Sequence, residues 1–479
     1  MNKSAFLVLL FFFVPFITYS QDCHCLNNFE YLVRKITENY PGFEDKVNSR
    51  TVVQYQYYTD SLRRLAAYAT AERCPSVLRS WLGFFKDKHL ILRLSGGVGE
   101  QAYVRSVFAA APAMAIDIGA VRRRFAGVGK GGIGLEGIWL SADSAFEVAL
   151  LRNAERRYQA VVLKADSVFW MPGQIKFEML STGHNSYQVM YRNRDHEEEM
   201  SGVVAEEESA VLRFAGTEWR KLLAGGNNRR AADPADDAVI AFKILNPLTT
   251  YLRLNSFSIV YKSVIDSLIR QHLPDITSRP NLIVDLRNNR GGYSIAFESL
   301  LPIIYTGEIR APRAKVLATR DNTALFEELV ADPRIPAKNK EVLGPLLVSM
   351  KAHPDTYVIT EEEIFQSDTV YSYPARVALL INERSVSAAE DLIMRARQSK
   401  KVKVFGRNSA GSFDYFNLVG PRTMPCKHYI YYCPTSKGMW VPEHPIDNIG
   451  LPPDIPISEV TDWVSYINTY FQHQKSWRN

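Results

Sequence analysis

The pattern of hydrophobic and polar positions divides the chain into three stretches. From Asn27 to about Lys86, apolar residues recur at spacings of three and four, which predicts helices. From Leu135 to about Lys221, short segments of alternating apolar and polar residues are separated by polar turns, which predicts antiparallel strands. From Val239 onward, continuous apolar runs of strand length alternate with amphipathic segments, which is typical of a mixed α/β domain.

These stretches predict the domain organisation. Residues 1–20 combine Lys3, an apolar run and small residues at 18–20, which indicates a signal peptide cleaved before Gln21. We expect an N-terminal helical segment at 21–96, a β-rich middle domain with its linker at 97–236, and an α/β domain at 237–479. The protein is therefore expected to be exported, to the periplasm or the cell exterior, with no membrane span after cleavage. A lipoprotein anchored through Cys23 is the weaker alternative.

One strand-to-helix turn is the first candidate for chemistry. Val377–Ile381 is an apolar run of strand length, and the stretch from Ala388 onward consists of good helix formers. Ser385 and Ser387 lie in the turn between them, where a hydroxyl is exposed and the first helical N–H groups are free. A nucleophile and an oxyanion site need this geometry. The alternative is that the serine simply caps the helix.

Two other loops follow predicted buried strands. Gly291-Gly292 comes directly after NLIVDLR and allows close backbone approach, although paired glycines also form ordinary tight turns. A Gly-X-X-Ser-X-Gly loop at 406–411 follows the strand 402–405. His89 lies where the N-terminal helical segment meets a short strand. A single histidine at such a junction is more often structural than catalytic.

Composition and charge exclude few classes. The net charge of +6 is small for 479 residues and the only basic run is Arg122–Arg124, so nucleic-acid binding is not indicated. The five cysteines, an odd number, leave at least one unpaired. Cys23-His24-Cys25 resembles half of a metal site but has no second pair nearby, so we interpret it as a disulfide partner or a disordered end.

Taken together, the motifs resemble those of the tail-specific (C-terminal processing) serine protease family. The segments that carry the likeness are DKHLIL (87–92), LIVDLRNNRGG (282–292), VALLINERSVSAAE (377–390), VKVFGRNSAG (402–411) and IDNIGLPPDI (446–455). Each motif is weak alone, but their order and separations match the family. The resemblance implies a mixed α/β catalytic core built of ββα units, joined to the N-terminal helical segment and the antiparallel β-rich middle domain.

The resemblance also implies roles for individual residues. Ser387, three positions before the glutamate of Ser-Ala-Ala-Glu, corresponds to the nucleophile. The N–H of Ala388 and that of Gly291 or Gly292 would form the oxyanion hole.

The general base departs from the commonest branch of the family. That branch has a lysine directly after the last glycine of the 406–411 loop, where this chain has Ser412. A second branch, resembling the tricorn protease core, uses a histidine, and His89 matches its Asp-X-His motif. Asp447 corresponds to that branch's glutamate, and a carboxylate there would orient the imidazole.

Other residues have supporting or rival roles. Ser409 and Asp414 are candidates for the branch's fourth member, and His444 is the rival base.

The prediction is an exported serine endopeptidase that forms an acyl-enzyme on Ser387 with His89 as general base. A peptide or protein is the expected partner, and no metal or organic cofactor is implied. The main alternative is a catalytically silent peptide- or ligand-binding protein on the same fold, which the missing lysine favours. A weaker alternative is a hydrolase of non-peptide esters, because the same chemistry cleaves both.

Overall fold

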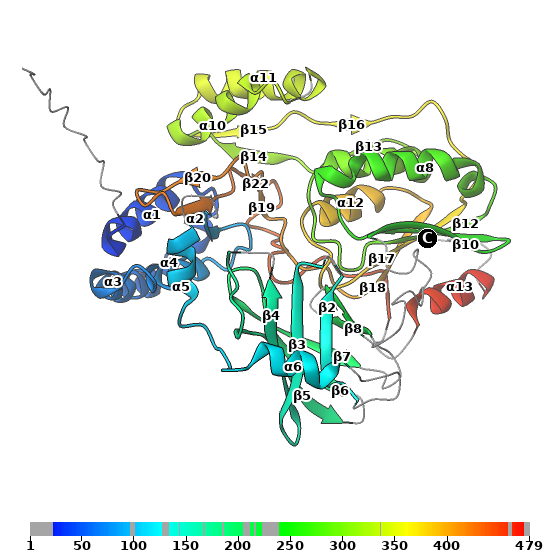
Figure 1. The fold of residues 1–479 in the computed structure, drawn as a ribbon. Helices are drawn as coiled ribbons and strands as arrows, with labels where there is room; N and C mark the ends of the chain where they lie inside the picture. Colours follow the sequence, from blue (N-terminus) through cyan, green and yellow to red (C-terminus); the bar gives the residue numbers. More distant parts are fainter. Residues whose placement is uncertain are drawn as a thin grey trace, which may run out of the picture.

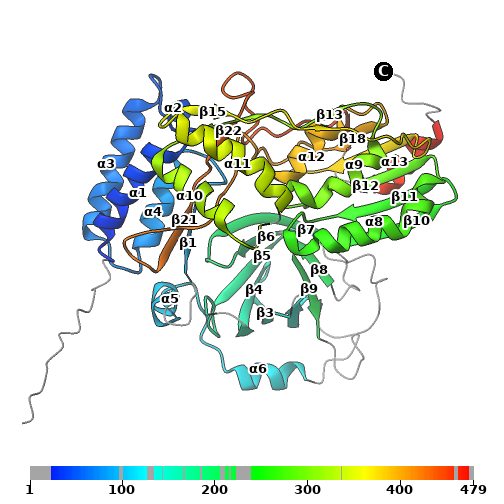
Figure 2. The ribbon, with the colours of Figure 1, turned by 90° about the horizontal axis from the view of Figure 1, so that it is seen from above.

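The fold is that of a computed structural model, which describes residues 23–95, 101–126, 134–142, 144–165, 168–183, 186–204, 211–214, 217–222, 239–335, 337–457 and 462–473. The predicted signal peptide and most of the predicted linker lie outside these ranges. The predicted mixed α/β fold class is confirmed. Figures 1 and 2 show the N-terminal helices at one end of the α/β core, with the β-rich middle region against both. The exact domain limits stay predictions.

The N-terminal segment is helical, as predicted. It contains α1 (Cys25–Asn39), α2 (Phe43–Lys46), α3 (Val52–Tyr68) and α4 (Cys74–Gly83). Helix α1 buries Phe29, Leu32 and Ile36, the spacing that places side chains on one face. Aromatic rings fill the space between the helices, and Trp81 packs edge-on against both Phe29 and Phe85.

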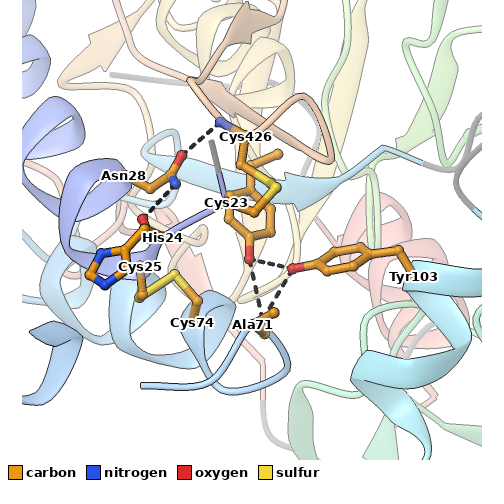
Figure 3. The surroundings of a disulfide bond; sticks show 9 residues. Cys23, His24, Cys25, Asn28, Ala71, Cys74, Tyr103 and Cys426 are labelled. Atoms are coloured by element: carbon orange, nitrogen blue, oxygen red, sulfur yellow. Dashed lines mark hydrogen bonds between the residues drawn. A yellow bond between two sulfur atoms is a disulfide. The ribbon is translucent and has the colours of Figure 1, made fainter. Parts of the chain in front are cut away.

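The two ends of the chain are joined. Strand β1 (Ile91–Leu94) pairs antiparallel with β21 (Tyr429–Tyr432), which also pairs with β20 (Arg422–Thr423). Disulfides link Cys23 to Cys426 and Cys25 to Cys74, as Figure 3 shows, and Cys433 is free and buried. The side-chain oxygen of Asn28 accepts from the Cys426 N–H at 2.9 Å. The N-terminal segment is therefore part of the same structure as the C-terminal strands.

The middle region is an antiparallel sheet, as the alternating pattern predicted. Its strand order is β7-β6-β5-β4-β3-β2-β9-β8. It is preceded by α5 (Gln101–Phe108) and α6 (Ile118–Phe125). The strands are β2 (Gly137–Ser141), β3 (Phe146–Ala154), β4 (Arg157–Ala165), β5 (Ile175–Gly183), β6 (Ser186–Arg192), β7 (Glu198–Val204), β8 (Val211–Phe214) and β9 (Thr217–Lys221).

The core contains a six-stranded sheet in the order β10-β11-β12-β17-β18-β23. These strands are β10 (Ile240–Asn246), β11 (Thr249–Leu254), β12 (Asn281–Asp285), β17 (Arg376–Ile381), β18 (Val402–Gly406) and β23 (Ile455–Pro456). From β11 to β23 all neighbours are parallel. Their carboxyl ends therefore meet at one edge, where open α/β sheets bind ligands.

Helices cover both faces of this sheet. Leu252, Val284 and Leu379 pack into one apolar cluster with α8 (Lys262–Thr277) and α12 (Ala388–Ala396). The alternate residues Tyr251 and Ile283 pack with α13 (Trp463–His473) on the opposite face. The short helical turns are η2 (Ile259–Tyr261), η3 (Ser294–Leu300) and α9 (Leu301–Ile304). Of these, η3 is a 3₁₀ helix that leads directly into α9.

The excursion between β12 and β17 carries small sheets and two helices, α10 (Arg320–Ala331) and α11 (Ala337–Ala352). Its strands are β13 (Ile309–Arg310), β14 (Ala314–Leu317), β15 (Tyr357–Ile359) and β16 (Ile364–Phe365). Strand β14 pairs with β22 (Ser436–Gly438), which also pairs with β19 (Tyr415–Phe416). Among the described residues, no helix combines the length and apolar character needed to cross a membrane.

Candidate active site

Ser387 lies at the carboxyl end of the central strand β17, directly before α12. Residues Val377–Ile381 of β17 are all buried, which fixes where the following turn can lie. Ser387 itself has φ 55° and ψ −110°. Positive φ is uncommon for a residue with a Cβ, and such strain concentrates at functional sites. An ordinary N-cap residue has an extended backbone, so helix capping alone does not explain this conformation.

The Ser387 turn is bound to the Gly-Gly turn that follows β12. Asn288 and Asn382 form a reciprocal pair, in which the Asn288 N–H donates to the Asn382 side chain and the Asn382 amide donates to Asn288 Oδ1. The Val386 N–H donates to the Asn289 carbonyl at 2.9 Å. The two turns therefore form one rigid unit at the edge of the sheet.

Gly291 packs directly against the serine. A Cβ on Gly291 would lie 2.7 Å from the Val386 carbonyl oxygen and 2.9 Å from Ser387 Cβ, and its φ is +78°. Only glycine fits this contact without strain. Glycine is therefore required at position 291 because the two turns approach each other closely. This supports the functional interpretation of the Gly-Gly motif.

The predicted oxyanion donors differ in availability. The Gly291 N–H donates to Asn289 Oδ1 at 2.8 Å and is engaged. Among the described residues, the N–H groups of Gly292 and Ala388 have no acceptor. Ala388 is the first residue of α12, where free N–H groups and the helix dipole favour negative charge. Ala388 and Gly292 are therefore the two donors open to a ligand.

Glu390 joins the Ser387 turn to a neighbouring loop through hydrogen bonds. Its side chain is buried, with an exposed fraction of 0%. It accepts hydrogen bonds from the Ser387, Gly411 and Ser412 N–H groups and from Ser409 Oγ, at 2.6–3.0 Å. Burial raises the pKa of this carboxyl, while the four donors act in the opposite direction. Glu390 thereby ties the nucleophile turn to the loop 409–412.

Ser409 has a structural position in that loop. Its hydroxyl donates to Glu390 and accepts from the Leu451 N–H at 2.7 Å. Ser412, at the position of the family's lysine, has a buried hydroxyl with no hydrogen-bond partner in the described part of the chain. No side-chain base therefore lies at this position.

His89 approaches the same loop from the N-terminal segment. Its neighbour Lys88 donates through Nζ to the Ala410 carbonyl at 2.7 Å, and the Ala410 N–H donates to the Ser385 carbonyl. On the other side, the Asn448 side chain donates to the Lys86 carbonyl. The turn with His89 and the turn with Ser387 thus contact one loop. In the part of the chain that the structure describes, Ser387 and His89 form no hydrogen bond; such bonds often tighten only when substrate binds.

Carboxylates gather beside His89. Asp87 Oδ1 lies 3.8 Å from His89 Nδ1, and Asp87 Oδ2 accepts from the Tyr40 hydroxyl at 2.8 Å. Asp447 lies behind them, 3.7 Å from Lys46 Nζ. The ion pairs of the described residues join His89 to Asp87 and not to Asp447.

Asp447 is held in a network that does not include the imidazole. Its Oδ1 accepts from the Asp414 N–H at 3.2 Å, and its own N–H donates to Asp414 Oδ2 at 2.8 Å. Asp414 also accepts from Trp440 Nε1 at 2.7 Å. Burial raises the pKa of Asp447 to about 8, with Asp87 and Asp414 adding to the shift and Lys46 opposing it. The rival base His444 is exposed.

Part of the chain that contains this site matches a known protein family. Residues 249–457 match the profile of peptidase family S41. This domain belongs to peptidase family S41. The match spans the Ser387 turn, the Gly-Gly turn and Asp447, whereas His89 lies outside it. No curated protein matches the chain in sequence.

Solved structures extend the likeness beyond the S41 domain. The fold is similar to that of mature CPAF, with a TM-score of 0.50 and 13% sequence identity over 91% of this chain and 92% of that one. The photosystem II D1 C-terminal processing protease has a TM-score of 0.39 and 13% identity, over 91% and 93% of the two chains. The tricorn protease has a TM-score of 0.39 and 11% identity, over 95% of this chain and 37% of the other. The first of these shows a shared fold across the N-terminal segment, the middle sheet and the S41 domain.

Two hollows meet beside the Gly-Gly and Ser387 turns of the S41 domain. One, of about 990 Å³, lies between the N-terminal segment and the middle sheet. The other, of about 1710 Å³, lies between the middle sheet and the S41 core. Glu199, Thr217 and Arg290 line both. Glu199 of β7 accepts from Arg384 at 2.9 Å and lies 3.9 Å from Arg290. The middle sheet therefore contacts both turns of the S41 site.

Sequence reasoning missed three residues around this S41 site. Glu390 follows Ser387 by three positions, which is the capping-box spacing and was a readable signal. Asp87 precedes His89 by two, but the motif was used only to place the histidine. Tyr40 gives no sequence signal, because only the packing of the end of α1 against the segment after α4 brings it to Asp87.

Proposed function

We propose that this chain is an exported serine endopeptidase that acts through an acyl-enzyme on Ser387, with His89 as the general base. The observation that carries the proposal is the conformation of Ser387 and its surroundings. The residue sits at positive φ in a strand-to-helix turn, against a Gly-Gly turn, beside two open N–H donors. An activated nucleophile and an oxyanion site need this combination.

In the proposed reaction, Ser387 Oγ attacks the scissile carbonyl carbon while His89 takes the hydroxyl proton. The carbonyl oxygen gains negative charge, which the N–H groups of Ala388 and Gly292 stabilise. His89 then gives the proton to the leaving amine as the C–N bond breaks, and the acyl group stays on Ser387. A water molecule, deprotonated by His89, releases the acyl group and restores the serine.

The hollows on either side of Arg290 support a peptide substrate. Together they run past the turns that carry Ser387 and the oxyanion donors. Both are lined by a mixture of polar and apolar side chains, and Glu199 of the edge strand β7 lines both. An extended chain can follow such a path. Export is supported by the signal-like residues 1–20 and by two disulfides, which persist in oxidising compartments.

A fluorophosphonate probe tests the proposal, because it labels only an activated serine. We expect the purified wild type to label at neutral pH and to cleave a fluorescent casein. Ser387→Ala should abolish both, and His89→Ala should slow labelling about 10²-fold or more. Lys401→Ala is the matched control, because Lys401 binds the Tyr371 carbonyl and should label like the wild type.

Two observations favour the alternative of a silent binding protein. The position of the family's lysine is Ser412, and Ser387 has no hydrogen bond to His89 among the described residues. A folded wild type that fails to label and cleaves no casein would overturn the peptidase proposal. Hydrolysis of simple esters without cleavage of casein would favour the ester hydrolase.

A further inference from the structure

The carboxylate nearest to the His89 ring is Asp87. The distance from Asp87 Oδ1 to His89 Nδ1 is 3.8 Å, and this nitrogen is buried with no hydrogen-bond partner in the described part of the chain. The side chain of His89 is 11% exposed and that of Asp87 is 1% exposed. The Asp87 carboxylate is therefore the candidate acceptor for a proton on His89 Nδ1.

Asp87 is held rigidly enough to orient a ring. Its Oδ1 accepts from the His89 N–H at 2.8 Å, so the carboxylate and the ring belong to one tight turn. Its Oδ2 accepts from the hydroxyl of Tyr40, which is itself 1% exposed. These two bonds fix both oxygens. The turn that joins Asp87 to His89 and the Tyr40 hydroxyl therefore hold the carboxylate together, beside the ring.

Asp447 has other partners. Its Oδ1 accepts from the Asp414 N–H, and its nearest cation is Lys46 of α2, at 3.7 Å. Its Oδ2 is buried without a hydrogen bond among the described residues, the condition of an oxygen that carries a proton or meets a water. The ion pairs of the described residues do not include one between Asp447 and His89.

We propose that Asp87, and not Asp447, is the positioning residue that orients His89 and balances the charge of its imidazolium. The inference rests on the proposed function, in which His89 is the general base. Asp447 then serves as a neutral neighbour that closes the buried end of the cluster.

The charges around the cluster agree with this assignment. Two buried carboxylates cannot both ionise cheaply when they lie close together. Asp447 faces the carboxylates of Asp87 and Asp414 and the ammonium of Lys46, and burial raises its pKa to about 8. Burial also leaves the pKa of Asp87 raised, although His89, the His89 N–H, Tyr40 and Lys46 all act in the opposite direction. Asp87 therefore has more groups beside it that favour its ionised form than Asp447 has.

The test measures the rate of fluorophosphonate labelling against pH for the wild type, Asp87→Asn and Asp447→Asn. Asn mimics a neutral aspartic acid in shape, so Asp447→Asn should keep the labelling rate within about threefold and leave the acidic limb of the profile in place. Asp87→Asn removes the charge that stabilises the imidazolium. It should slow labelling about 10–100-fold and move the acidic limb to lower pH by about one unit.

The reverse pattern, with a slow and shifted Asp447→Asn and a normal Asp87→Asn, would overturn the assignment. If Asp87→Asn does not fold, the Asp447→Asn profile decides alone, because a neutral Asp447 predicts that it matches the wild type. A second measurement separates this inference from the proposed function. NMR titration of the His89 ring in the Ser387→Ala protein should shift with Asp87→Asn and stay unchanged with Asp447→Asn, even if the wild type never labels.

Discussion

At the scale of single residues, the site depends on one close contact, between Gly291 and the Ser387 turn. Gly291→Ala would place a Cβ 2.7 Å from the Val386 carbonyl oxygen at a φ of +78°. The two turns must separate, which moves the Gly292 N–H away from the oxyanion position. We expect fluorophosphonate labelling to fall by about 10²-fold, the usual effect of losing one oxyanion donor. Gly307→Ala, which meets nothing within 4 Å, should label normally.

Asp447 gives a second prediction at this scale, in the pH dependence of stability. Its folded pKa of about 8 lies above the ordinary value of 3.8, so the folded protein keeps a proton that the unfolded chain releases. The free energy of unfolding should therefore fall as pH rises from 4 to 8. Asp447→Asn cannot lose this proton. In urea titrations at pH 5 and pH 9, its stability relative to the wild type should increase with pH, by up to about 4 kcal/mol.

Asp332→Asn is the control for the urea titrations, because Arg334 lowers the pKa of Asp332 to about 2. The contribution of that group is complete above the ordinary aspartate pKa and is lost only in acid. Between pH 5 and pH 9, the free energy of unfolding of the Asp332→Asn variant should change with pH as that of the wild type does. An Asp447→Asn protein that also follows the wild type would mean that Asp447 is already ionised at neutral pH.

Individual residues also show which parts of the candidate site the sequence could predict. Local signals were sufficient for the serine turn, because an apolar strand, a small-residue turn and a helix follow one another directly. The Gly-Gly turn was predicted for the same reason. Asp87 lies only two residues before His89 in the sequence. Which carboxylate faces the ring, however, depends on how the N-terminal elements pack in the folded protein. No spacing along the chain expresses that.

At the scale of elements, the edge strand β7 connects the middle sheet to the catalytic turns. Arg384 precedes the nucleophile by three residues and Arg290 precedes Gly291, and Glu199 of β7 contacts both. Glu199→Gln keeps the shape but weakens both contacts. Because the pair is partly exposed, global stability should change by less than about 1 kcal/mol. We expect casein cleavage to fall several-fold with a smaller effect on labelling, since the probe does not need the groove.

Glu198→Gln is the matched control for Glu199. Glu198 pairs with Arg192 inside the middle sheet and does not bridge to the core in the described contacts. It should leave casein cleavage unchanged. Equal effects of the two substitutions would show that β7 acts only through the stability of its own sheet. The sequence predicted the strands of this sheet from their alternation, but the docking of β7 on the catalytic turns rests on three side chains from distant segments.

At the scale of the whole molecule, the proposed base and the proposed nucleophile come from opposite parts of the chain. His89 belongs to the N-terminal segment, which lies outside the S41 match and is held by the pairing of β1 with β21 and by Cys23–Cys426. The sequence predicted this segment as helical and as the carrier of the histidine. It did not predict that the segment shares a sheet with the C-terminal strands, because long-range pairing has no local signature.

The Cys23–Cys426 disulfide should therefore matter for catalysis as well as for stability. Removing it as the double variant Cys23→Ser/Cys426→Ser frees the end of the segment that carries the base. We expect the free energy of unfolding to fall by about 2–4 kcal/mol. Labelling should fall further than for Cys433→Ser, because Cys433 is unpaired and buried and its removal breaks no crosslink. Thermal unfolding and labelling of both variants under oxidising conditions measure these effects. A double variant that unfolds earlier but labels at the wild-type rate below its melting temperature would show that β1–β21 pairing alone keeps His89 in place.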